Sequence, residues 1–186
     1  MLLDGRVVAA TAFEKLVETH HSEIHRYLWR VVALGASADD LAAETFLRAF
    51  RNRGSLSTDA DPRAWLFAIA TRLCRNHLRS ERRRPATSAR GRGVWSADGI
   101  RPDAETAQDA RGRLEADIRH LPVSQRLAFT MRRFHDLAYE AIGVSLGCSA
   151  RQARGHVYRA FHRIRHKRDA AATGAEESLK AVRDPR

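Results

Sequence analysis

The chain has 186 residues and carries 33 Lys and Arg against 22 Asp and Glu, a formal net charge of +11. This excess of positive charge predicts an anionic partner, either nucleic acid or a membrane surface. No apolar run approaches the roughly 20 residues that a membrane-spanning helix needs, so we favour nucleic acid. The N-terminal residues lack the charged start of a secretory signal. Cys74 and Cys148 form neither a disulfide framework nor a zinc spacing, which suits a reducing cytoplasm.

Residues 13–33 carry apolar side chains on one broad face and predict an amphipathic helix. Within it, His21 and His25 are four residues apart and could share a metal ion. The sequence does not match the H-E-x-x-H pattern of zinc proteases, because Glu23 comes two residues after His21 instead of one. We therefore prefer an ordinary surface helix. A metal-dependent hydrolase using His20, His21 and His25 is the alternative, which metal analysis would test.

A second helix is predicted after Gly35, with the segment 37–40 as its capping sequence. Its apolar face carries Ala42, Phe46, Ala49 and Phe50, and a second face carries Asp40, Glu44 and Arg48 at steps of four residues. A regular polar face of this kind is either exposed to solvent or docks a partner. The periodicity alone does not choose between these two possibilities.

A third helix follows the polar loop 51–61, because Asp61 is a good N-cap and Pro62 suits the first helical position. Four arginines recur on this helix at steps of three, four and three residues: Arg72, Arg75, Arg79 and Arg82. Residues 63–92 hold nine Arg and a single acid, Glu81. Such a ridge of guanidinium groups is suited to follow a phosphate backbone.

Residues 85–103 are rich in Pro, Gly, Ser and Arg and show no periodicity, which predicts a flexible linker. Trp95 is its one large apolar residue and could anchor it on a partner. Helical patterns resume near Ala104 and again over residues 124–134, where apolar residues form a stripe: Leu127, Ala128, Met131 and Phe134.

Residues 137–165 predict a helix-turn-helix. Gly147 suits the turn because it can adopt positive φ, and Ser149 with Gln152 can form a capping box at the start of the second helix. The predicted buried stripe of that helix is Ala153, Val157, Ala160, Phe161 and Ile164, and its opposite face reads Arg151, Gln152, Arg154, His156, Arg159 and Arg163. An ordinary helical hairpin with a solvated basic face is the alternative, but the coincidence of cap, turn and charge favours a DNA-reading helix.

The sequence therefore predicts an all-α protein of two small helical domains joined by a flexible linker. The expected boundaries are an N-terminal extension at 1–12, a first domain at 13–84, the linker at 85–103, a second domain at 104–168 and a tail at 169–186. We expect no enzyme, since no phosphate-binding glycine loop, paired carboxylates or Ser/His/Asp grouping stands out. No cofactor and no metal site are expected.

Two segments resemble bacterial RNA polymerase sigma factors of the extracytoplasmic-function (ECF) type, in the sigma-70 family. ADDLAAETFLRAF, from residue 38, is similar to the core of the family's region 2, and PRAWLFAIATRLCRNHLR, from residue 62, to the helix that follows it. The segment from Leu121 to Arg165 is similar to region 4 without a gap. Both segments in this order make the resemblance specific.

The resemblance implies a factor that binds core RNA polymerase, at its clamp coiled coil and flap, and directs it to promoters. By this resemblance the clamp is contacted by Asp40, Leu41, Glu44, Phe46 and Arg48. The −10 element would be held as an unpaired strand by Asn52, Arg53, Ser55, Trp65, Arg72, Arg75, Asn76 and Arg79. The −35 duplex would be read by Ser149, Arg151, Gln152, Arg154, His156, Arg159 and Arg163.

The family also implies a cytoplasmic protein with an anti-sigma partner. The position of Gln152 leaves its role open, because a side chain that closes the capping box cannot also read a base. The alternative function is a stand-alone helix-turn-helix regulator that binds duplex operator DNA, which would leave the first basic segment unexplained.

Overall fold

The computed structural model describes residues 4–32, 35–56, 60–83 and 107–183, and within these ranges all regular secondary structure is helical. The elements are α1 (Asp4–Val31), α2 (Gly35–Arg51), the 3₁₀ turn η1 (Arg53–Ser55), α3 (Pro62–Arg83), α4 (Ala107–Arg119), α5 (Val123–His135), α6 (Tyr139–Leu146) and α7 (Ala150–Arg183). The all-α fold is thus confirmed. The predicted linker, including Trp95, lies outside the described residues, as does the side chain of Arg82.

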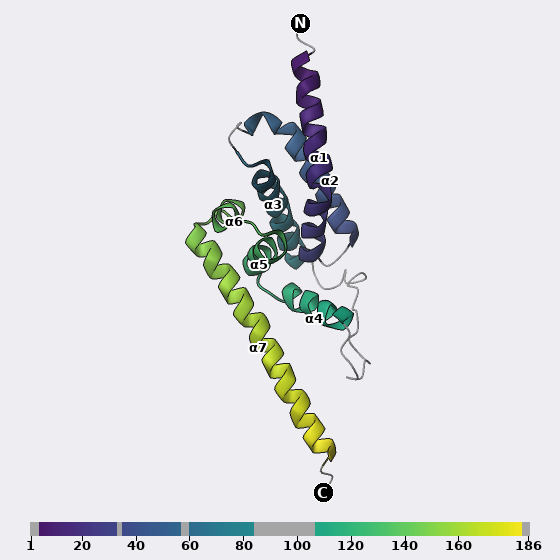
Figure 1. Ribbon diagram of the computed structural model, residues 1–186, viewed down its shortest axis with the longest axis vertical. Coiled ribbons are helices and arrows are strands. Elements are labelled where there is room, and N and C mark those ends of the chain that lie inside the picture. Colours follow the sequence, from purple (N-terminus) through teal and green to yellow (C-terminus); the bar gives the residue numbers. More distant parts are fainter. Residues whose placement is uncertain (1–3, 33–34, 57–59, 84–106, 184–186) are drawn as a thin grey trace.

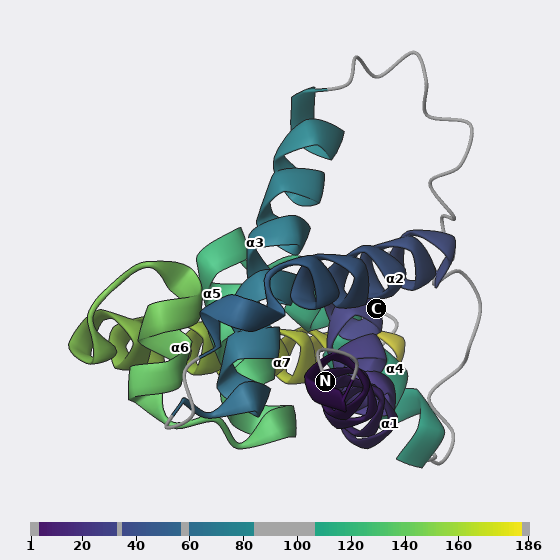
Figure 2. The ribbon, with the colours of Figure 1, turned by 90° about the horizontal axis from the view of Figure 1, so that it is seen from above.

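Helices α1 to α3 form an N-terminal unit and helices α4 to α7 a C-terminal unit, and the two lie against each other (Figure 1). Helices α1 and α7 point towards opposite ends of the molecule, while α5 and α6 lie beside α3 (Figure 1). Seen from above, the C-terminal half of α3 projects from the body (Figure 2). None of the described helices combines the length and apolar character needed to cross a bilayer.

One hydrophobic cluster joins the two units. From the N-terminal unit it takes Tyr27, Leu28, Leu66 and Phe67, and from the C-terminal unit Leu127, Met131, Leu137, Ile142 and Leu146. A smaller cluster holds α4, α5 and α7 together through Ile118, Leu121, Phe129, Ala160 and Ile164. Burial of apolar surface is the main favourable term in folding, so the interface between the units is part of the core of this structure.

Several helix boundaries follow the local signals, and others do not. Pro62 is the first residue of α3, and the Arg63 backbone N–H donates to the Asp61 carboxylate at 2.9 Å, as the Asp-Pro pair predicts. The sequence suggests that Gly35 ends the first helix, but α1 ends at Val31 and α2 begins at Gly35. The expected N-cap segment 37–40 therefore lies inside α2, where Ala38 is fully buried.

Candidate nucleic-acid interface

The start of α7 is built as the sequence predicts. The Ser149 hydroxyl accepts a hydrogen bond from the Gln152 backbone N–H at 3.2 Å, and the Gln152 side-chain carbonyl accepts one from the Ser149 backbone N–H at 3.0 Å. This reciprocal pair is a capping box, which satisfies two backbone donors at the helix start. The Gln152 carbonyl oxygen also lies 3.2 Å from the Ser149 hydroxyl. Because the cap occupies this oxygen, we assign Gln152 to positioning the helix.

The turn between α6 and α7 is tight for two reasons. Gly147 caps α6 in the left-handed region, with φ of +68°, as predicted. Gly143, one turn earlier, lies directly under the returning chain: a Cβ there would be 2.7 Å from the Cys148 carbonyl oxygen and 3.2 Å from the Ala150 nitrogen. Sequence reasoning did not single out Gly143, because only the folded turn brings Cys148 and Ala150 over it.

The N-terminal half of α7 presents a basic, solvent-exposed surface. Arg151, Arg154, Arg159 and Arg163 are exposed, and His156 is half-buried. Burial lowers the pKa of His156, and the neighbouring Arg159 guanidinium lowers it further. Of the predicted buried stripe, Ala153, Ala160 and Ile164 are buried, but Phe161 is 55 % exposed. The prediction for Phe161 was wrong because α5 and α4 cover a narrower strip of α7 than its apolar residues occupy.

A groove between α5 and α7 combines positive charge with aromatic rings. Its charged residues are Arg132 and Arg133 from α5, Asp136 just after α5, which pairs with Arg132 at 2.9 Å, and Arg151, Arg154 and Arg159 from α7. Its aromatic residues are Phe129, Tyr139, Tyr158 and Phe161. Guanidinium groups at this density favour a phosphate-bearing partner. The aromatic residues of this groove were absent from the predicted site.

The second predicted DNA surface lies on α3 and the turn before it, and part of it is engaged in contacts within the protein. Arg72, Asn76 and Arg79 are exposed, whereas Arg75 is half-buried and donates a hydrogen bond to the Leu146 carbonyl of α6 at 2.8 Å. Trp65 is half-buried against the core cluster. The arginine ridge therefore divides into exposed positions and one position that contacts the C-terminal unit.

The turn residues predicted for the same surface hold the backbone of η1. The Asn52 amide donates to the Arg48 carbonyl at 2.8 Å, and the Ser55 hydroxyl donates to the Asn52 carbonyl at 2.7 Å. Arg53 donates to the Phe50 carbonyl at 2.7 Å and stacks over the Phe50 ring, 4.2 Å from its centroid. All three residues remain exposed.

The outer face of α2 differs in part from the predicted polymerase contact. Asp40 and Arg48 are exposed, and Arg48 pairs with Glu44 at 2.6 Å. Phe46, by contrast, is 9 % exposed and belongs to the core cluster, and Leu41 packs against that cluster. Among the described side chains of α2, the large exposed apolar residues are Leu47 and Phe50. Any partner docked on this face therefore meets polar groups with Leu47 and Phe50 between them.

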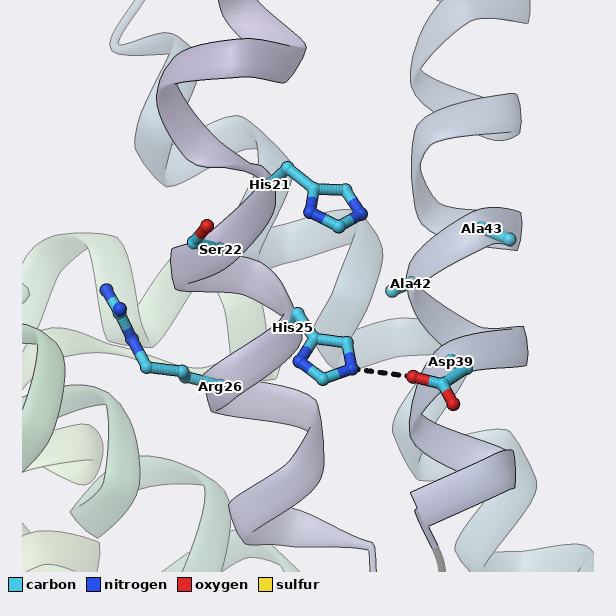
Figure 3. A pocket seen from close by; sticks show the side chains of 7 residues that line it. All are labelled: His21, Ser22, His25, Arg26, Asp39, Ala42 and Ala43. Atoms are coloured by element: carbon cyan, nitrogen blue, oxygen red, sulfur yellow. Dashed lines mark hydrogen bonds and ion pairs between the residues drawn. The ribbon is translucent and has the colours of Figure 1, made fainter.

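Two of the three histidines considered as metal ligands, His21 and His25, line a pocket between α1 and α2 (Figure 3). His25 is hydrogen-bonded to the Asp39 carboxylate at 2.6 Å, and the His21 ring stacks on Phe46 with centroids 5.6 Å apart. His20 instead lies 3.8 Å from Glu23. Among the described residues, no group of three or more His, Cys, Asp or Glu side chains is close enough to hold a metal ion.

Comparison with known proteins shows that the two segments of the chain that carry these surfaces match one family. A family model for sigma-70 region 2 matches residues 16–84, and one for sigma-70 region 4 matches residues 111–164. The RNA polymerase sigma-H factor of Pseudomonas aeruginosa is 32 % identical over 162 residues, covering 82 % of this chain and 84 % of the relative. The ECF RNA polymerase sigma factor SigC of Mycobacterium tuberculosis is 31 % identical over 170 residues, covering 89 % and 84 %.

This chain belongs to the ECF type of the sigma-70 family. Sigma factors are DNA-binding transcription initiation factors that bind core RNA polymerase and have no enzymatic activity of their own. The fold agrees: the sigma factor RpoE of Bartonella quintana, solved in complex with the anti-sigma factor NepR, superposes with a TM-score of 0.62 at 22 % identity. That superposition covers 83 % of this chain and 95 % of RpoE.

A polar cluster between the two units of this sigma factor was missed by sequence reasoning. Arg63 of α3 donates three hydrogen bonds to the Glu23 carboxylate of α1, at 2.6, 3.0 and 3.2 Å, and a further one to the His135 carbonyl at the end of α5. The His135 ring nitrogen Nδ1 lies 3.2 Å from the same carboxylate, and the ring packs on Tyr27 and Phe67. We call Glu23, Arg63 and His135 the interunit cluster. No local pattern predicts it, because His135 lies 112 residues from Glu23 along the chain.

Contacts within the interunit cluster shift the pKa values of Glu23 and His135. Burial alone would raise the pKa of Glu23, but hydrogen bonds and charge attraction from Arg63 and His135 outweigh it and lower that pKa. Burial lowers the pKa of His135; Glu23 opposes this shift, and the charges of Arg30 and Arg63 add to it. The second ring nitrogen of His135, Nε2, is buried without a hydrogen-bond partner, so a proton placed there would remain unsatisfied.

Acidification should therefore destabilise the protein through His135. A histidine whose pKa is lowered on folding contributes stability that is complete above its unfolded pKa, 6.5, and is lost as the pH falls below it. Urea unfolding at pH 7.5 and 5.5 should show a larger loss of unfolding free energy in the wild type than in His135→Gln, which cannot take up the proton. Equal losses in the two proteins would contradict this assignment.

Proposed function

We propose that this sigma factor directs RNA polymerase to promoters by reading the −35 duplex with the start of α7 and holding the −10 element with α3 and η1. The observation that carries the proposal is the capped, exposed and basic start of α7, which stands on the same chain as a second basic helix. Arg151 and Arg154 lie in the first turn and a half after the cap, the part of a recognition helix that reaches base edges.

Roles within the first surface follow from exposure and position. Arg154, with its side chain exposed one turn into α7, is our principal base-reading candidate, since bidentate Arg–guanine pairs are the commonest specific contact. Arg159 and Arg163, farther along the helix, are better placed for phosphate. Ser149 and Gln152 hold the helix start, and His156 lies beside Arg159, with its Nδ1 3.3 Å from the guanidinium.

On the second surface, the exposed side chains of Arg72, Asn76 and Arg79 would meet the −10 strand, and the positive charge suits single-stranded DNA. Polymerase would dock on the outer face of α2, through Asp40, Glu44 and Arg48. We extend this docking surface to Leu47 and Phe50, since exposed apolar residues between polar ones are typical of interface centres. We also propose an anti-sigma protein as a partner and the cytoplasm as the place of action.

Arg154→Ala should reduce promoter-specific initiation about tenfold or more, the effect of losing one good base contact of about 1–3 kcal/mol, and should leave core polymerase binding unchanged. Run-off transcription from a cognate promoter, together with titration of core polymerase, measures both. Arg165→Ala is the matched control, because Arg165 is also exposed on α7 but lies outside the predicted site.

Three outcomes separate the alternatives. Equal loss of initiation and polymerase binding in Arg154→Ala would point to misfolding or a wrong assignment of Arg154. No association of the wild type with core polymerase at micromolar concentration would reject the sigma function. Specific binding to duplex DNA without polymerase association would favour the stand-alone regulator.

A further inference from the structure

A glycine lies at the centre of the exposed face of α7, in the second turn of the helix. At about 100° per residue, Gly155 is about 160° around the helix from the buried Ala153, with Arg154 to one side of it and Arg159 to the other. Gly155 and both arginines line the groove between α5 and α7. The outward face of this turn therefore has two arginines at its edges and no side chain of its own between them.

The fold does not require a glycine at this position. Among the described glycines only Gly147 has a positive φ. The three atoms nearest to a Cβ added at Gly155 all belong to the Arg159 guanidinium, at 3.3, 3.6 and 3.7 Å, whereas a Cβ at Gly143 would meet backbone atoms. Glycine inside a helix is less stable than alanine. A residue that breaks a local preference without a packing reason is typical of a functional site.

The space above Gly155 is filled by the side chain of Arg159. Side chains of a helix lean towards its N-terminus, and residues four apart are neighbours on its surface, so Arg159 covers Gly155. The Arg159 nitrogen Nη2 lies 3.3 Å from the ring nitrogen Nδ1 of His156. Because a guanidinium only donates hydrogen bonds, Nδ1 of His156 accepts this one. The guanidinium is thus held over the backbone by a neighbour on its own helix.

This placement changes what the Arg159 guanidinium can reach on DNA. Its position along α7 alone suits Arg159 to phosphate. The guanidinium, however, lies one turn nearer the helix start, over Gly155 and at the centre of the outward face. Base edges are read inside the major groove, whereas phosphates belong to the backbone that borders it. A guanidinium at the centre of this face is directed at base edges, where two of its donors match the O6 and N7 acceptors of guanine.

We propose that Gly155 is a specificity-determining residue of the −35 reading helix, because its missing side chain lets the Arg159 guanidinium, oriented by His156, lie across the centre of α7 and read a base edge. The proposal rests on the function proposed above and adds a base contact to the role of Arg159. Gly155 is a positioning residue that acts through Arg159. Arg154 and Arg159 then read different base pairs from the two sides of Gly155.

The test is the sequence preference of polymerase carrying the full-length chain, measured by selection and sequencing of duplex DNA randomised in the −35 and −10 segments. Gly155→Ala should lose about tenfold or more of its discrimination at particular −35 base pairs. Arg159→Ala should lose it at the same base pairs, and Arg154→Ala at others. The double variant Gly155→Ala, Arg159→Ala should lose no more than Arg159→Ala, since both changes act through one guanidinium.

Two controls separate this effect from a loss of structure. Gly112→Ala also adds a methyl group to a helical glycine, but on α4, away from the α7 surface, and should leave the −35 preference unchanged. The added methyl group of Gly155→Ala displaces only the end of a flexible side chain, so its urea unfolding midpoint should not fall below that of the wild type. A lower midpoint would show that folding needs the glycine and would overturn the proposal.

The remaining outcomes distinguish the inference from the proposed function. If the wild-type holoenzyme discriminates between −35 sequences and Gly155→Ala discriminates equally well, the function stands and the role of Gly155 is rejected. A uniform weakening across all sequences in Arg159→Ala would show a phosphate contact alone and would also reject it. If the wild-type holoenzyme shows no −35 preference, the proposed reading of the −35 duplex itself fails.

Discussion

Gly143→Ala should lower the free energy of unfolding by about 2 kcal/mol, although alanine is the better helix former. The new Cβ would lie 2.7 Å from the Cys148 carbonyl oxygen and 3.2 Å from the Ala150 nitrogen. Both are backbone atoms, so relief requires moving the turn between α6 and α7. Overpacking of this kind costs about 1–3 kcal/mol or more, which exceeds the roughly 1 kcal/mol that alanine gains over glycine in a helix.

Gly112→Ala is the matched control, because Gly112 lies in α4 and the methyl group of an alanine there would meet no neighbouring atom within 4 Å. There the helix propensity acts alone, and the protein should gain about 0.5–1 kcal/mol. Urea unfolding followed by circular dichroism at 222 nm measures both variants. A neutral or stabilising Gly143→Ala would mean that the turn adapts easily, and the close approach would then not limit the α6–α7 geometry.

Arg126→Met should cost about 3 kcal/mol of unfolding free energy, because Arg126 joins the ends of two helices from inside the core. Arg126 is 9 % exposed. Its guanidinium donates to the Val31 carbonyl at the end of α1, at 2.9 Å, to the Leu121 carbonyl beyond α4, at 3.4 Å, and to the Arg119 carbonyl. Hydrogen bonds from charged groups contribute about 1.5–3 kcal/mol, and a cation at helix C-termini also meets their negative ends.

Methionine preserves most of the side-chain length without any donor, so the carbonyls of α1 and α4 would lose their partner while the packing changes little. Arg119→Met is the control: Arg119 is half-exposed and pairs with Glu115 within α4 at 3.7 Å, and its loss should cost at most about 0.5 kcal/mol. Denaturant titration of both variants at pH 7.5 measures these changes in unfolding free energy. If the unfolding free energy of Arg126→Met lies within about 0.5 kcal/mol of the wild type, the two helix ends are held by apolar packing alone.

Structural features that depend only on residues close together in the sequence were predictable from it. The capping box of Ser149 and Gln152, the left-handed Gly147 and the start of α3 at Pro62 are each fixed within four residues of chain. The start of α2 was not, since the acidic segment that looked like a cap continues a helix that begins at Gly35. There burial of Ala38 in the core outweighs the local preference of the capping residues.

In the candidate site, too, the exposure of some residues could be predicted from the sequence and that of others could not. The exposure of Arg151 and Arg154 follows from helical periodicity: at about 100° per residue, Arg151 lies opposite the buried Ala153 and Ala160, and Arg154 lies about 100° to one side of them. The exposure of Phe161 and of Phe50 does not follow from periodicity, because periodicity shows that a residue lies on an apolar face but not which neighbour covers it. Arg75 and Arg79 lie one turn apart on the same helix, and the sequence does not distinguish them. Only the packing of α6 on α3 gives Arg75 a hydrogen-bond partner, the Leu146 carbonyl.

The sequence by itself determined an all-helical chain with two basic segments, a capped basic helix and the family to which they belong. These properties depend on residue type, helical period and contacts within one turn. Only the tertiary structure decided that Glu23, Arg63 and His135 meet, that Arg126 closes the ends of α1 and α4, and that α6 rests on α3. The physical reason is the separation along the chain: bonds that join residues 40 to 112 positions apart depend on how whole helices pack, and no short window of sequence encodes that packing.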